Sequence, residues 1–199
     1  MRFPFAPIVL AGLLAACSSG SDLFVTLPAH VPAPGSSALA QTSPGSISIA
    51  LFDEQRPSGK TSGWIGERAG LTASRAANAV YAVPPPGIAV RDALISEFRA
   101  AGWQVQKDAA DKLDGQVSLT LTTSGSIGST WYMTASAALK VHLTTPSGER
   151  SGTYQATCKD GQLAWPEAED LAKTANRCLD GVIGQFTSDT VMARALGAP

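Results

Sequence analysis

The sequence WYMTASAALKVHL, residues 131–143, alternates apolar side chains with mostly polar ones along its whole length. Successive side chains of a strand point to opposite faces, so this period of two predicts a long β-strand with one buried and one solvated face. Residues 116–122 and 151–158 repeat the pattern, and the connections at 123–130 and 146–149 are rich in turn residues. We therefore expect three consecutive strands of an antiparallel meander.

Two other segments have the spacing of helices. Apolar residues recur every three or four positions over 88–101, and Gly102 follows as a C-terminal cap before a short strand at 103–106. The second helix begins near Pro166, has acidic residues in its first turn and continues to Phe186. A last helical piece is expected over 188–196.

Further strands are expected at 47–53 and 79–83, before the first helix. The order is then strand, loop, helix, strand, meander, helix. A sheet with one apolar face must cover that face, and the amphipathic helices supply the cover. The sequence predicts an α+β fold: a two-layer sandwich of a mainly antiparallel sheet with two amphipathic helices on one face.

The N-terminus is typical of a signal peptide. Arg2 precedes an apolar run over 3–14 that is too short to span a bilayer, and the run ends in Leu14-Ala15-Ala16-Cys17. This tetrapeptide resembles the bacterial lipobox, which implies that Cys17 becomes the acylated first residue of the mature protein. Two or three acyl chains would anchor it permanently. The alternative is a secreted protein with a chance cysteine near its cleavage site.

Ser18, in place of Asp, stands in the second mature position and resembles lipoproteins sorted to the outer membrane. The expected organisation is a signal peptide at 1–16, an acylated Cys17 with a flexible Ser/Pro/Gly-rich linker over 17–45, and one α+β periplasmic domain over 46–199. The linker lacks apolar periodicity, so we expect it to hold the domain well clear of the membrane.

Two further cysteines remain once Cys17 is acylated. Cys158 and Cys178 form a pair in what is expected to be an oxidising compartment, and a disulfide between them would close a loop of about 20 residues. We expect this disulfide; the alternative is two buried free thiols.

From about Ser46 to the C-terminus the chain resembles the YajG-type lipoproteins of Gram-negative bacteria. The resemblance rests on FRAAGWQV at 98–105, on WYMTA at 131–135 and on the acidic, Ala-rich helix from Glu167. It implies a lipobox and an α+β periplasmic domain, and it brings no catalytic residues.

The sequence offers little catalytic chemistry. Its histidines are His30, in the expected linker, and His142, on the polar face of a strand, which favours neither a Ser-His-Asp arrangement nor a metal site. Gly59-Lys60-Thr61 lacks the glycine that a phosphate loop needs at position 54. The net charge of −1 gives no basic surface for nucleic acid. We therefore expect no enzyme, no cofactor, no metal and no nucleic-acid partner.

The predicted contact residues are Asp53, Arg56 and Trp64 in an expected loop over 53–70, and Tyr132 on the solvated face of the meander. Trp and Arg dominate contact surfaces, although Trp64 could instead fold over the sheet edge while Asp53 pairs with Arg56. The expected function is that of a non-enzymatic binding or accessory lipoprotein that contacts an envelope protein complex. The alternative is a carrier that holds a small molecule or lipid between sheet and helices.

Overall fold

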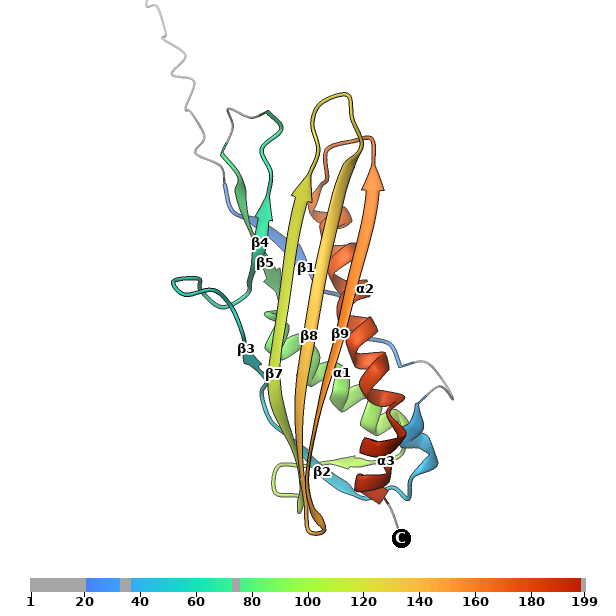
Figure 1. The fold of residues 1–199 in the computed structure, drawn as a ribbon. Helices are drawn as coiled ribbons and strands as arrows, with labels where there is room; N and C mark the ends of the chain where they lie inside the picture. The colour runs from blue at the N-terminus through green and yellow to red at the C-terminus, as the bar shows by residue number, and fades with distance from the viewer. Residues whose placement is uncertain (1–20, 33–36, 73–75, 198–199) are drawn as a thin grey trace, which may run out of the picture.

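A computed structural model describes residues 21–32, 37–72 and 76–197 (Figure 1). The predicted signal peptide, Cys17 and Ser18 lie outside these residues. The elements, in chain order, are β1 (Leu23–Thr26), η1 (Ala38–Gln41), β2 (Ser46–Ile49), β3 (Asp53–Glu54), β4 (Trp64–Arg68), β5 (Asn78–Val83), α1 (Pro86–Ala100), β6 (Gln104–Val105), β7 (Asp111–Ser124), β8 (Trp131–Thr145), β9 (Gly148–Gln162), α2 (Ala168–Thr187) and α3 (Thr190–Gly197).

The described part of the chain forms one mixed sheet of nine strands. Its centre is the predicted meander, in which β8 pairs antiparallel with β7 on one side and β9 on the other. β8 occupies one edge of β7 along nearly its whole length, so β2, β3 and β4 follow one another along the other edge, all parallel to β7. β6 extends the sheet beyond β2, while β5 and then β1 extend it beyond β4.

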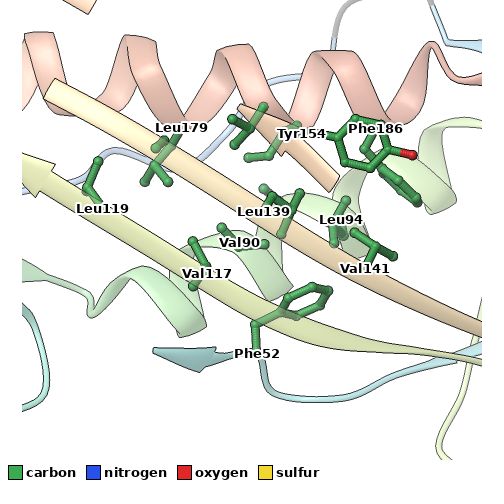
Figure 2. Close-up of a cluster of buried hydrophobic side chains, with 14 of the residues drawn as sticks. Phe52, Val90, Leu94, Val117, Leu119, Leu139, Val141, Tyr154, Leu179 and Phe186 are labelled. Carbon is green, nitrogen blue, oxygen red and sulfur yellow. The ribbon is translucent and has the colours of Figure 1, made fainter. Parts of the chain in front are cut away.

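Both long helices lie on the same face of this sheet, behind it in Figure 1. Figure 2 shows Val90 and Leu94 of α1 and Leu179 of α2 gathered against strand side chains such as Leu139. The predicted facing of the strands is confirmed, because Val141 is buried and its neighbour Lys140 is exposed. The predicted α+β sandwich is therefore the observed fold class.

The structure corrects the predicted strand at 47–53. Ile47 and Ile49 are buried as expected, but Leu51 is 58% exposed and Phe52 takes the next place in the core. The chain shifts its facing between these residues, and the segment divides into β2 and β3.

The predicted loop over 53–70 is also partly wrong, because its second half is the strand β4, which lies between β5 and β7. Gly66 permits this position. A Cβ atom at Gly66 would lie 1.8 Å from the carbonyl oxygen of Leu121, and its φ of +156° falls where side chains are rarely tolerated. β4 can pair this closely with β7 only because residue 66 has no side chain.

The largest correction concerns the predicted linker over 17–45. Its residues 23–26 form β1, which pairs parallel with β5, and residues 38–41 form η1. Val25 and Leu39 are fully buried members of the core. The boundary at residue 46 is therefore wrong, because the folded domain already includes β1. None of the described helices is long and apolar enough to cross a membrane.

Candidate functional site

A cleft of about 380 Å³ lies between α1 and α2, beside the segment Leu27–His30, which we call the strap. Its α1 wall carries small side chains at helical spacing, Ala89, Ala93 and Ser96, and these leave the space open. The α2 wall is formed by residues spaced one turn apart, so that they share one face of that helix: Asn176, Leu179, Asp180 and Ile183.

His30 ties the strap to both helices. Its Nδ1 lies 2.8 Å from Oδ1 of Asp180 on α2, and its Nε2 lies 2.6 Å from Oε1 of Glu97 on α1. An ionised carboxylate only accepts hydrogen bonds, so the two contacts favour the protonated imidazole, in which both ring nitrogens donate. The hydrogen bond to Asp180 raises the pKa of His30 above its ordinary value, although burial opposes this. Glu97 is buried, whereas the Asp180 side chain is 41% exposed, so the ion pair joins three distant segments from the interior out to the surface.

The cleft combines apolar walls with negative charge. Asp92 is exposed at its rim, and Asp180 accepts a hydrogen bond from Asn176 as well as from His30. Such a site suits an apolar group that carries a positive charge beside it. Within the described ranges, no group of three His, Cys, Asp or Glu side chains could hold a metal ion.

Of the predicted contact residues, Arg56 bonds to the carboxylate of Glu54, which also binds the backbone just before Trp64. That carboxylate accepts hydrogen bonds from the backbone N–H of Gly63 (3.0 Å) and from Arg56 (3.3 Å). Arg56 therefore pairs with Glu54, and the predicted partner Asp53 is exposed in β3. The segment between β3 and β4 is consequently held in shape by its own polar groups.

Trp64 belongs to β4 and is half-buried beside Tyr81 of β5, with Nζ of Lys60 4.7 Å from its ring centroid. This packing agrees with the alternative in which Trp64 folds onto the sheet. Tyr132 lies elsewhere: it pairs with Ser124, whereas Asp53 pairs with Gln116. Eight residues of a strand span about 26 Å, so the four residues do not form one surface.

The two remaining cysteines are free thiols in the structure. Cys178 is buried and donates from Sγ to the carbonyl oxygens of Ala135 and Ala156, both at 3.3 Å. Burial raises the pKa of Cys178 to about 12, and the half-buried Cys158 thiol lies next to it. The structure therefore has the alternative arrangement of two thiols, and the predicted disulfide is not formed in it.

Sequence reasoning missed the residues that organise the cleft. His30 was assigned to a linker, and its partners lie 67 and 150 positions away. One signal was present: Glu97 stands three residues after Leu94 and one before Phe98, on the buried stripe of α1. An acidic residue at such a position needs a buried partner.

Comparison with protein-family models places this α+β sandwich among the lipoproteins. Residues 71–197 match the family Lipoprotein_16, described as uncharacterised lipoproteins. The chain belongs to this family, which confirms the resemblance to YajG-type lipoproteins. No curated protein matches the chain.

A solved structure shares this fold. Protein XCC0632 from Xanthomonas campestris, of the DUF330 family, is 13% identical with a TM-score of 0.53, over 87% of this chain and 97% of that one. An uncharacterised protein is 14% identical with a TM-score of 0.43, over 90% of this chain and 99% of its own. At such identities the likeness to XCC0632 concerns the fold alone.

Proposed function

We propose that the protein is a membrane-anchored lipoprotein of the cell envelope that binds a partner and catalyses no reaction. Acylated Cys17 would hold it in the outer membrane, with the folded domain in the periplasm. The sequence Leu14-Ala15-Ala16-Cys17, Ser18 after it and the membership of a lipoprotein family support this proposal.

The observation that carries the binding role is the cleft between α1 and α2. Its volume of about 380 Å³ falls in the range of ligand sites, and its walls are mainly apolar with a few polar groups at fixed positions. The carboxylates of Asp92, Asp180 and Glu97 outnumber the one imidazolium of His30 at the cleft, so a positively charged neighbour is favoured. The partner that fits is a segment of an envelope protein that places an apolar side chain in the cleft beside a Lys or Arg.

A second candidate function is that of a carrier for a small apolar molecule, which the cleft volume also favours. The cleft lies between two helices and the strap, whereas the sequence analysis expected a ligand between sheet and helices. A cationic amphiphile would use the same carboxylates.

The proposal is tested by a substitution that fills the cleft with a large side chain. Ala89 is half-buried and lines it, while the preceding residue, Ile88, is exposed and does not. Ala89→Trp should leave the thermal melt nearly unchanged and reduce partner binding at least tenfold, about 1.4 kcal/mol. Ile88→Trp, which adds the same group outside the cleft, should bind as the wild type does.

The measurement uses the full chain purified from membranes in mild detergent. Chemical crosslinking in the envelope, before purification, detects a protein partner. Native mass spectrometry of the purified chain detects a bound small molecule. Loss of the crosslink in Ala89→Trp supports partner binding, and loss of a small-molecule adduct supports the carrier. Unchanged binding of both kinds in Ala89→Trp would contradict the assignment of the cleft.

A further inference from the structure

We propose that one end of the molecule rests on the lipid surface, with the side chains of Ile127 and Leu163 in the membrane interface. This inference rests on the proposed function, because it takes Cys17 as the acylated residue. The acyl anchor alone does not determine which surface of the folded domain faces the membrane.

The chain between Cys17 and the folded domain is short. The described structure begins at Ser21, and Asn78 of β5 donates a hydrogen bond to the Ser21 carbonyl oxygen at 2.7 Å. Four Cα–Cα steps separate Cys17 from Ser21, so the two residues are no more than about 15 Å apart. Because β1 already belongs to the sheet, the end of the domain that holds Ser21 lies close to an acylated Cys17 and so to the membrane.

The β7–β8 turn and the β9–α2 connection lie at the same end of the domain as Ser21. β1 runs parallel to β5 from its first residues, and β5 begins opposite the end of β4, where Arg68 pairs with Asn78. β4 in turn lies along the last part of β7. The β7–β8 turn and the β9–α2 connection follow at this same end, because Trp131 pairs with Gln162 (Figure 1, top).

Each of these two connections exposes a large apolar side chain. Ile127 at the β7–β8 turn is 66% exposed, and Leu163 after β9 is 84% exposed. Residues 124–131 and 161–166 contain no charged side chain. The opposite end of the sheet differs, because Lys107 and Asp108 lie in the connection between β6 and β7, and Glu149 and Arg150 lie at the start of β9. A lipid interface accepts these two uncharged connections at far lower cost than the charged ones at the opposite end.

The hydrogen bonds within the turn at 125–130 lower the cost of placing it in a region poor in water. Ser126 and Ser129 bond to each other: the Ser126 N–H donates to Oγ of Ser129 at 3.0 Å, and the Ser129 N–H donates to the Ser126 carbonyl oxygen at 3.0 Å. Several polar groups of the turn are thus satisfied internally while Ile127 projects from its tip.

Trp165 strengthens this end in the β9–α2 connection. Its Nε1 donates to the Ala69 carbonyl oxygen at 3.1 Å, and the Arg68 guanidinium lies 3.7 Å from its ring centroid. Tryptophan is enriched at membrane interfaces, and here it fixes the connection that carries Leu163 against the sheet.

The test is photocrosslinking of the full acylated chain in phosphatidylethanolamine and phosphatidylglycerol vesicles that contain a phospholipid with a photoreactive acyl chain. Mass spectrometry then locates the crosslinked residues. We expect the yield in 125–130 and 163–165 to exceed that in the β8–β9 turn at 146–149 several-fold. In Ile127→Ser with Leu163→Ser, the yield at both connections should fall several-fold while flotation with the vesicles is unchanged.

The outcomes separate the two proposals. A chain that floats with the vesicles but crosslinks equally at both ends, or mainly at 146–149, would overturn the orientation and leave the anchor standing. A chain that does not float at all would overturn the anchor and the orientation together.

Discussion

At the scale of the residue, His30 joins segments that are far apart in the sequence. It places one cation between the carboxylates of Glu97 and Asp180, and so connects the strap to α1 and α2. The raised pKa of His30 gives this contact a definite pH dependence. A group whose pKa is higher in the folded state stabilises fully below its unfolded pKa, and this contribution disappears as the pH rises through the folded pKa.

The first prediction concerns the loss of stability as the pH rises through the pKa of His30. Between about pH 6 and about pH 9 the wild type should lose more thermal stability than His30→Gln, because only the wild type has the His30 imidazole to lose a proton there. Asp92 also lines this cleft and contributes negative charge near the ion pair. His142→Gln is the control, because His142 lies on the exposed strand face and bonds to Ser151.

An NMR titration of the imidazole measures the pKa of His30 directly. We expect a midpoint above the ordinary value of about 6.5. A midpoint at or below that value, or equal pH dependence of wild type and His30→Gln, would contradict the ion pair.

The second prediction concerns Cys158 and Cys178, whose thiols are adjacent. If the domain faces an oxidising compartment, the pair should be joined in protein isolated from the envelope. Thiol counting under denaturing, non-reducing conditions should then find neither cysteine free, and two titratable thiols would refute the disulfide. Burial of Cys178 raises its pKa and shields it, so an oxidant from solvent reaches the half-buried Cys158 first.

At the scale of the element, the meander follows from its sequence and the flanking strands do not. The alternation over 131–143 fixes which side chains of β8 face the helices, since a slip of one residue would expose all of them. β4 carries no such pattern: it places Gly66 and the buried Arg68 within five residues. β1 has four residues, and its pairing with β5 depends on a partner more than fifty positions away.

The third prediction tests the facing of β8. Val141→Asp should destabilise the domain by several kcal/mol or unfold it, because it buries an unpaired carboxylate among apolar side chains. Lys140→Asp, one residue earlier on the exposed face, is the matched control and should change stability by less than about 0.5 kcal/mol. Chemical denaturation measures both, and equal losses would show that the facing is wrong.

At the scale of the whole molecule, the domain is elongated along β8. Fifteen residues of strand span about 50 Å, with the start of β1 at one end and α3 near the other (Figure 1). The fold class and the family could be predicted from the sequence, because both depend on the meander and the amphipathic helices. The cleft could not, because it depends on how the strap, α1 and α2 meet in three dimensions.

The central claim is that this domain belongs to a lipid-anchored protein, and the decisive residue is Cys17. Mass spectrometry of the N-terminal peptide, from protein purified out of the envelope, tests it most directly. We predict a peptide that begins at Cys17 and carries the mass of its acyl chains. Cys17→Ser should abolish this species and leave an uncleaved or soluble chain. An unmodified peptide that begins at any other residue would contradict the claim.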